Sequence, residues 1–434
     1  MLFCNIGLLD EQFAFHPGMF VGVRDAVIDY IGAQRPAADY GTSYDGTGKL
    51  LCPGLVNAHS HASMTLMRGY GENLALDAWL NTRIFPFEAH MGRQEIYNGA
   101  MLAFAEMIRS GTVSVTDMYC FGEQMGQAVL ESGIKCNVSL GVTCFDGSPL
   151  RDLPKHAENQ RLLRDWHNAG DGRYKLDLSI HGEYTSHEGL VREMADYARE
   201  TGLRVHIHLS ETKKEHEECK LRRNGKTPAQ YFASTGLLDA PTTAAHCVWL
   251  EGEDFDLLRE KGVTVVNNPV SNLKLASGLC KVPLLLEKGV NVALGTDGAA
   301  SNNSLDLFEE MKLYALLYKG SSGDPTLVTP AQALFAATRA GALSQGRTDC
   351  GAIRLGNRAD LIVLDTRIPS MQPIHSMPVN LVYSARGGDV VLTMVDGKVL
   401  YQDGEYKTID LEKVLFEANR SVSKILSKLA APSK

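Results

Sequence analysis

Residues 50–61 read LLCPGLVNAHSH and guide the interpretation of the whole chain. An apolar run punctuated by a Pro-Gly turn predicts a buried strand. Side chains two residues apart on a strand point to the same side, so His59 and His61 present two imidazoles together. Neutral imidazole is a preferred ligand of zinc and its transition-metal neighbours. The stretch therefore offers half of a metal site, and the alternative is a pair of histidines hydrogen-bonded in a core.

The size and composition of the chain are those of an ordinary globular protein. It has 434 residues, of which 44% are hydrophobic and 22% charged, with a formal net charge of −8. No basic run is present, so nucleic-acid binding is not expected. No apolar stretch is long enough for a membrane span or a signal peptide. The nine scattered cysteines lack a C-x-x-C pair, which favours free thiols in the cytoplasm.

Short apolar runs alternate with amphipathic stretches such as residues 189–198 through the middle of the chain. Strands that alternate with helices predict βαβ units and a parallel sheet, and eight such units predict a (β/α)8 barrel. The eight strand candidates are residues 56–61, 112–119, 135–143, 175–181, 204–210, 242–248, 263–268 and 291–297.

Both ends of the chain have a β character that differs from the middle. Residues 19–31 and 359–400 contain short apolar runs, and Asp396-Gly397 between two of them is a strong hairpin signal. We therefore expect residues 1–52 plus 351–434 to form a small composite β-sandwich domain with a C-terminal helix. Residues 53–350 are expected to form the catalytic barrel.

Ionisable residues gather where the predicted barrel strands end, which is where barrel enzymes carry their catalytic groups. Three histidines and one carboxylate make a sound site for a single ion and leave a position for water. His206 is expected to face away from His208 and to pack against the outer helices. The residues at strand ends are His59, His61, Asp117, His181, His208, His246 and Asp297, and we predict His59, His61, His208 and Asp297 as the metal ligands.

The predicted site holds one divalent ion per chain, with zinc expected and iron or manganese as alternatives. A second metal would need a bridging group such as a carboxylated lysine at the end of the fourth strand, and the only lysine there, Lys175, lies at its start. The metal lowers the pKa of bound water and supplies hydroxide. Asp297 can also take the proton of that water, and His246 can hydrogen-bond the hydroxide. Glu211 is placed to move a proton to a ring nitrogen, the alternative being an exposed carboxylate at a helix start.

With these residues in place, the sequence resembles the amidohydrolase superfamily and, within it, the nucleoside and triazine deaminase branch. The motifs are PGLVNAHSH at 53–61, HIHLSET at 206–212, AHC at 245–247 and GTDG at 295–298. Their order and spacing cover the whole predicted barrel. The likeness is strongest to the family of 5-methylthioadenosine/S-adenosylhomocysteine deaminases.

The resemblance implies hydrolytic deamination of adenine nucleosides to the inosine form with release of ammonia. The expected substrates are adenosine, 5′-deoxyadenosine and 5′-methylthioadenosine, with S-adenosylhomocysteine left open. The expected partner is thus a small nucleoside, and a homo-oligomer is expected. The H-x-E…P-C-x-x-C signature of cytidine-type deaminases is absent from the sequence.

Residues 67–88 resemble the first substrate loop of that family. The resemblance implies that Glu88 binds the ribose hydroxyls, and a carboxylate can accept hydrogen bonds from both members of a diol. The alternative for Glu88 is a solvated loop acid. Trp79 is expected to line the pocket of the 5′-substituent or else to be a core residue. His181, in HGEYTS at 181–186, is expected near the purine or ribose, although the family pattern has a proline where Glu183 stands.

Another departure concerns the 5′-substituent. Relatives that accept S-adenosylhomocysteine place arginines near the end of the third strand and in the following loop, where this chain has TCFD at 143–146. Arg151 or Lys155 could bind an amino-acid carboxylate, but neither is an obvious match.

Two other functions remain open from the sequence. The first is deamination of a free base or heterocycle such as guanine, cytosine, a pterin or an s-triazine, none of which has a diol for Glu88 to bind. The second is a catalytically silent binding barrel, which the presence of all the proposed ligands together with Glu211 and His246 argues against.

Overall fold

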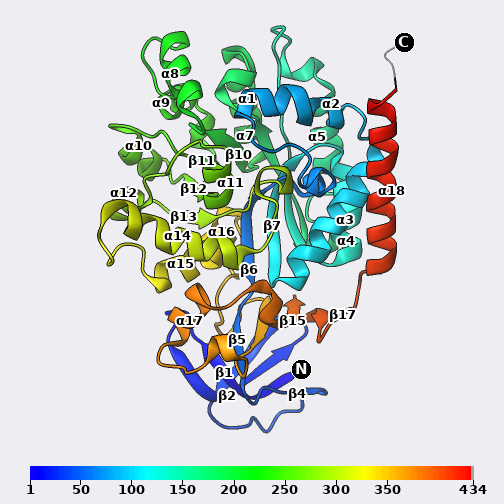
Figure 1. Cartoon of the computed structure of the whole chain (residues 1–434), viewed down its shortest axis with the longest axis vertical. Helices are drawn as coiled ribbons and strands as arrows, with labels where there is room; N and C mark the ends of the chain where they lie inside the picture. The colour runs from blue at the N-terminus through cyan, green and yellow to red at the C-terminus, as the bar shows by residue number, and fades with distance from the viewer. Residues whose placement is uncertain (432–434) are drawn as a thin grey trace.

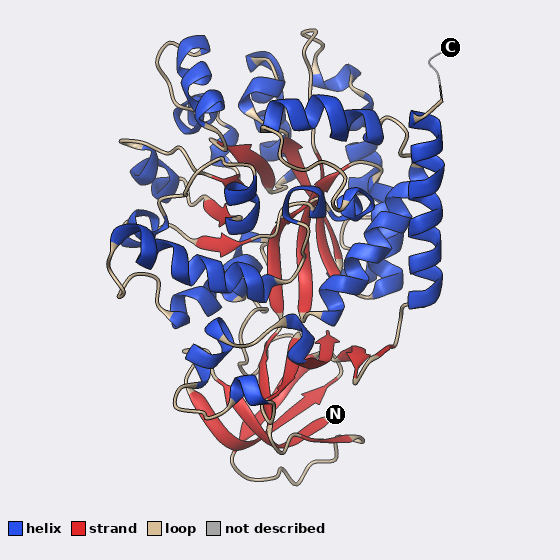
Figure 2. Ribbon diagram, viewed as in Figure 1, coloured by secondary structure: helices blue, strands red, loops and turns tan. Residues whose placement is uncertain are grey.

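The structure is a computed structural model that describes residues 1–431. An eight-stranded parallel sheet surrounded by helices forms the larger part, and a nine-stranded mixed sheet lies at one end of the long axis (Figures 1 and 2). The N-terminus lies in the mixed sheet, whereas the last described helix, α18 (Leu411–Leu429), ends near the opposite end of the molecule. This arrangement confirms the predicted fold class.

The parallel sheet is the predicted (β/α)8 barrel, and its strands follow one another in sequence order from β6 to β13. Their bounds are β6 Leu55–Ser60, β7 Thr112–Tyr119, β8 Lys135–Leu140, β9 Tyr174–Ile180, β10 Val205–Leu209, β11 Thr242–His246, β12 Thr264–Asn267 and β13 Val292–Leu294. The last three predicted strands are shorter than expected, because the backbone stops pairing with the neighbouring strand and continues into the loops that carry the site.

Helices cover the outside of the barrel, and short helices lie within the loops at its upper end (Figure 1). They are α1 Leu76–Trp79, α2 Phe85–Glu88, α3 Arg93–Arg109, α4 Gly122–Ser132, α5 Pro154–Asp165, α6 Ala169–Gly172, α7 Glu188–Thr201, α8 Lys213–Arg222, α9 Pro228–Ser234, α10 Asp254–Glu260, α11 Pro269–Lys274, α12 Val282–Glu287, α13 Ala299–Asn302, α14 Leu307–Ser322, α15 Pro330–Ala337 and α16 Arg339–Ser344. Short turns of helix, η1 Ala62–Met67, η2 Leu80–Ile84, η3 Leu150–Asp152, η4 Glu183–Thr185 and η5 Leu237–Asp239, complete the connections.

The first and eighth strands are joined by side chains as well as by backbone. The Asn57 amide donates to the Thr296 hydroxyl at 2.7 Å, and the Thr296 backbone N–H donates to Asn57 Oδ1 at 3.1 Å. The Asp297 backbone N–H donates to the His59 carbonyl at 3.0 Å. Gly295 permits this approach, since a Cβ there would lie only 2.8 Å from the His59 carbonyl oxygen. The closure places His59 and Asp297 side by side.

The mixed sheet is built from both ends of the chain. Its strand order is β17-β16-β15-β14-β5-β1-β2-β3, with β4 paired to β1. Asp396 and Gly397 both have positive φ and form the predicted hairpin turn between β15 and β16. One apolar cluster joins residues from both ends, for example Phe3 and Leu361. The bounds are β1 Leu2–Leu9, β2 Phe15–Arg24, β3 Val27–Gly32, β4 Ser43–Asp45, β5 Lys49–Pro53, β14 Leu361–Asp365, β15 Val390–Val395, β16 Lys398–Gln402 and β17 Glu405–Tyr406, with η6 Pro369–Met371, α17 Met377–Tyr383 and η7 Gly387–Asp389 between β14 and β15.

The C-terminal helix α18, Leu411–Leu429, leaves the mixed sheet and runs along the barrel beside α3 (Figure 1). Asn98 of α3 donates to the Ser421 hydroxyl at 2.9 Å, and Lys424 pairs with Glu95 at 2.7 Å. Residues 432–434 of the predicted helical segment lie outside the described residues. Helix α18 therefore packs on the barrel. The domain boundaries proposed near residues 52 and 351 separate the two sheets but do not separate this helix from the barrel.

All nine cysteines lie within the described residues and none forms a disulfide, as the sequence predicted. Eight of the nine side chains are buried, and Cys120 is half-buried. Within residues 1–431, no helix combines the length and apolarity that crossing a membrane requires.

Candidate active site

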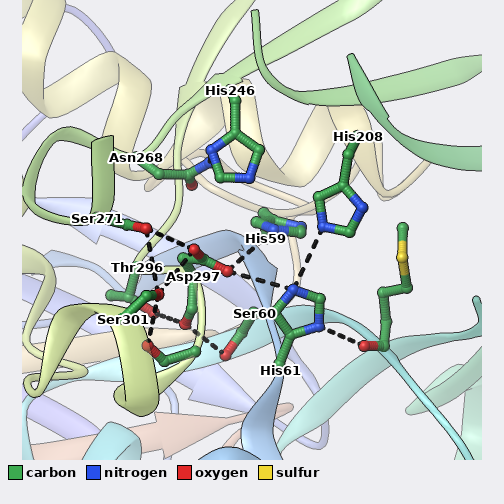
Figure 3. A network of polar contacts seen from close by, with 12 residues as sticks. His59, Ser60, His61, His208, His246, Asn268, Ser271, Thr296, Asp297 and Ser301 are labelled. Carbon is green, nitrogen blue, oxygen red and sulfur yellow. Dashed lines mark hydrogen bonds and ion pairs between the residues drawn. The ribbon is translucent and has the colours of Figure 1, made fainter. Parts of the chain in front are cut away.

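The four predicted ligands meet at the carboxyl ends of the barrel strands. His59 lies in β6, His61 directly follows it, His208 lies in β10 and Asp297 follows β13 (Figure 3). Asp297 Oδ1 lies 3.4 Å from His59 Nε2 and 3.2 Å from His61 Nε2. His208 Nε2 lies 3.3 Å from His61 Nε2. One potential ligand atom from each residue therefore points at a common position.

The other polar atoms of these residues are held by the protein. His61 Nδ1 donates to the Met118 carbonyl at 2.5 Å, and His208 Nδ1 donates to the His181 carbonyl at 2.7 Å. A carbonyl oxygen can only accept, so both rings carry a proton on Nδ1, and in the neutral form they present an unprotonated Nε2. Such partners of the second ring nitrogen are typical of metal-ligating histidines.

The carboxylate of Asp297 is fixed in a similar way. Its Oδ2 accepts from the Ser271 hydroxyl at 2.6 Å and from the Ser301 hydroxyl at 2.8 Å, which leaves Oδ1 facing the histidines (Figure 3). Burial alone would raise the pKa of Asp297, but the neighbouring rings of His59 and His61 bring it well below its usual range. The carboxylate is therefore ionised where the imidazoles converge.

The arrangement calls for a cation. If both rings are neutral, two unprotonated nitrogens 3.3 Å apart repel each other, and the buried Nε2 of His59 has no hydrogen-bond partner among the described residues. Burial would lower the pKa of His61, but Asp297 raises it to about 9, so the carboxylate favours a second proton on this ring, and a divalent cation would supply the positive charge in its place. Three imidazole nitrogens and one carboxylate oxygen suit a divalent transition metal. The residues present fit a metal ion.

His246, predicted beside the ligands, also reaches this position. Its ligand atom groups with those of His59 and Asp297, all within 4.8 Å of one another. Asn272 Oδ1 lies 2.9 Å from His246 Nδ1, and the residue adopts a left-handed φ of +72°. Amide support of Nδ1 leaves Nε2 directed at the ligand cluster, where it can hydrogen-bond a water bound there.

Glu211 lies between β10 and α8 and lines the same cavity as the ligands. It is only 9% exposed, and burial raises the pKa of its carboxyl group. The helix α8 begins two residues later with Thr212 as its cap. Its buried place in the cavity suits proton transfer better than the alternative of an exposed carboxylate at a helix start.

The expectation for His206 was wrong. His206 and His208 are two residues apart on β10, so both face the barrel interior, while Val205, Ile207 and Leu209 face the surrounding helices. His206 Nε2 lies 2.9 Å from His59 Nδ1, one layer below the ligand cluster. It therefore contacts a predicted ligand and not the outer helices.

A cavity of about 540 Å³ opens above the ligands and receives all three predicted substrate residues. Glu88 accepts a hydrogen bond from the Tyr119 hydroxyl at 2.5 Å, and burial raises the pKa of Glu88. Trp79 is 5% exposed and donates from its indole to the Gly71 carbonyl at 3.0 Å. The buried Nδ1 of His181 has no hydrogen-bond partner. The ring of His181 thus has a free polar atom at the cavity.

Tyr119 lines the cavity but was not predicted as a site residue, and Lys155 was considered only as a possible partner for an amino-acid carboxylate. Tyr119 is the last residue of β7, two residues after Asp117. This position at a strand end is the sequence signal from which it could have been predicted. Asp117 itself lies deeper and accepts from the Ala62 N–H at 2.5 Å. Lys155 lines the cavity and donates to the Gly141 carbonyl, whereas Arg151 is exposed and does not line it.

Comparison with known proteins gives a consistent result. The model of the amidohydrolase family matches residues 50–400. A protein of Dictyoglomus thermophilum named 5-methylthioadenosine/S-adenosylhomocysteine deaminase is 43% identical over 384 residues, 88% of this chain and 89% of that protein. A 5′-deoxyadenosine deaminase of Methanothermobacter thermautotrophicus is 43% identical over 395 residues, 91% of this chain and 92% of that protein. The crystal structure of an adenosine deaminase from Xanthomonas campestris with bound zinc superposes with a TM-score of 0.91 at 30% identity, covering 98% of each chain.

Proposed function

Because this chain belongs to the amidohydrolase family, we propose that it is a metal-dependent deaminase that converts adenine nucleosides to their inosine form and releases ammonia. One observation carries the proposal: a single cavity joins the ligand cluster and Glu211 to Glu88, a half-buried carboxylate suited to a ribose diol. A free base has no diol for such a carboxylate to bind.

The chain's own residues have distinct tasks in this reaction. When bound, a divalent metal supplies hydroxide by lowering the pKa of water. Glu211 delivers a proton to the ring nitrogen next to the amino-bearing carbon, and burial, which raises the pKa of its carboxyl group, favours the protonated form that this task needs. His246 can hydrogen-bond the oxygen that attacks this carbon. Asp297 accepts the proton that the attacking water loses, and its ionised state permits this.

The nucleoside is oriented by the opposite wall of the cavity. Glu88 accepts from the ribose hydroxyls while Tyr119 keeps one of its oxygens in place. His181, which lines the cavity, can offer a ring nitrogen to the purine or ribose. Burial lowers the pKa of His181 to about 3, so this ring is neutral and recognises the substrate without charge.

The lining of the cavity favours a small uncharged 5′-substituent. Among the described residues that line it, Lys155 is the one lysine or arginine, and it already donates to the Gly141 carbonyl. Burial lowers the pKa of Lys155, which weakens it as a partner for a carboxylate. Apolar side chains dominate elsewhere, among them Leu76, Trp79, Leu80, Ile84, Phe85 and Leu275. We therefore propose 5′-deoxyadenosine and 5′-methylthioadenosine as better substrates than S-adenosylhomocysteine.

We further propose that the metal is zinc and that one ion binds per chain. The support is a donor set of three imidazoles and one carboxylate, which suits zinc: among the described residues, His59, His61 and His208 form one group of potential ligands, and His59 and Asp297 belong to a second group that overlaps it. The homo-oligomer and the cytoplasmic location expected from the sequence stay predictions, and light scattering in solution tests the first.

Initial rates on a substrate panel test the proposal. The panel contains adenosine, 5′-deoxyadenosine, 5′-methylthioadenosine, S-adenosylhomocysteine and guanine, with ammonia release measured for each. The proposal expects the highest kcat/KM for a nucleoside with an uncharged 5′-group. Activity on guanine with none on any nucleoside would replace it by free-base deamination, and metal binding without any turnover would favour a silent binding barrel.

A further inference from the structure

The ligand His59 differs from its neighbours in what its second nitrogen contacts. His61 and His208 each place Nδ1 against a backbone carbonyl, which can only accept a hydrogen bond. His59 Nδ1 instead lies 2.9 Å from Nε2 of His206, with the two rings nearly perpendicular at 87°. An imidazole nitrogen can donate or accept, so this contact alone does not decide which tautomer His59 adopts.

The contact that His206 makes through its other ring nitrogen, Nδ1, determines which ring donates the hydrogen bond between His59 and His206. His206 is completely buried and its hydrogen-bond partners are His59 and Ser139. A buried imidazolium with no acid beside it would be costly, so the ring is neutral and carries a single N–H. The Ser139 hydroxyl donates its one proton to the Asp117 carbonyl at 3.1 Å. Its oxygen can then only accept from His206 Nδ1, 3.4 Å away.

The tautomer of His59 follows from assigning one N–H to each neutral ring in this series of contacts. If His206 donates from Nδ1 to Ser139, its Nε2 carries no proton and accepts from His59. His59 then holds its proton on Nδ1, and its Nε2 presents a lone pair. That atom is the buried nitrogen that has no hydrogen-bond partner and faces Asp297 at 3.4 Å.

We propose that His206 is a positioning residue that, oriented by Ser139, fixes His59 in the tautomer able to bind the metal. The inference rests on the proposed metal-dependent function. The proposal assigns a role to His206, which contacts neither the metal position nor the cavity. In contrast to His61 and His208, whose tautomers are set by backbone carbonyls, His59 has a tautomer that is set by side chains.

Metal affinity tests the proposal without reference to turnover. Zinc affinity is measured by competition with a chromophoric chelator for the full chain and for His206→Gln and His206→Met. Glutamine offers an oxygen acceptor to His59 and an N–H donor to Ser139, so it should bind zinc within a few-fold of the parent. Methionine offers neither and should lose about 10- to 100-fold in affinity, the usual cost of removing such a partner.

A pair of serine variants provides a matched control. Ser139 and Ser179 are both completely buried on barrel strands, and Ser179 lies beside His206 in the strand register. The Ser179 hydroxyl has no hydrogen-bond partner. Ser139→Ala should weaken zinc binding, though less than His206→Met, whereas Ser179→Ala should leave it unchanged. Thermal unfolding of the metal-free forms separates loss of fold from loss of affinity.

The outcomes are distinct. Parent-like zinc affinity in a folded His206→Met, or equal losses in the two serine variants, would overturn the proposal. If His206→Met is unfolded, the serine pair decides by itself. A parent that binds zinc with the predicted variant pattern but deaminates no nucleoside would overturn the proposed function and leave this inference standing.

Discussion

The interaction between Glu88 and the ribose gives a sharp quantitative prediction. Replacing Glu88 by alanine removes a half-buried carboxylate, one oxygen of which already accepts from the Tyr119 hydroxyl at 2.5 Å. The remaining acceptor positions are open to the substrate diol. A hydrogen bond to a charged group contributes about 1.5–3 kcal/mol. The loss of one such bond therefore lowers kcat/KM for a riboside by at least about tenfold, and the loss of two lowers it by considerably more.

The assay compares four values of kcat/KM in a double-mutant cycle. The parent and Glu88→Ala are each measured with 5′-deoxyadenosine and with a 2′,3′-dideoxy analogue that the parent accepts. Removal of both the acid and the diol should cost little more than removal of either, because one interaction is deleted once. Tyr119→Phe is the control, since it removes the hydroxyl that touches Glu88 but leaves the carboxylate. Equal losses on both substrates would show that Glu88 only supports the loop.

Three further changes have defined outcomes. Glu211→Gln should keep the bound metal, by elemental analysis, but lose about 10²-fold or more in kcat, the scale of a general acid–base group; turnover within a few-fold of the parent would assign the proton to another residue. Chelation should abolish activity, and one equivalent of zinc per chain should restore it, whereas a requirement for two would exclude the single-metal site. Lys135→Met should lower the free energy of unfolding in urea by about 3–5 kcal/mol, because it removes the cation 2.6 Å from the buried Asp360, whereas Asp396 keeps its ion pair with Arg173 at 3.1 Å; a change below about 1 kcal/mol would contradict this.

The sequence by itself determined the barrel and the chemistry at its strand ends. Strand periodicity is local, so an apolar run ending in His59-Ser60-His61 places two imidazoles on one face whatever surrounds it. The alternation of such runs with helices then brings all strand ends to one side of the barrel. His208 and Asp297 could be assigned to the same site from this rule, although they stand far from His59 in the chain.

Only the tertiary structure decided which side chains touch across the barrel and outside it. His59 and His206 are 147 residues apart, and Tyr119 meets Glu88 because a loop helix folds over a strand end. Such contacts depend on the tilt and stagger of the closed sheet, which no local pattern encodes. The docking of α18 against α3 is of the same kind, since an amphipathic helix specifies an apolar face but not the surface that will cover it. The tautomer of His59 is therefore a property of the folded barrel, because its cause lies on three other strands.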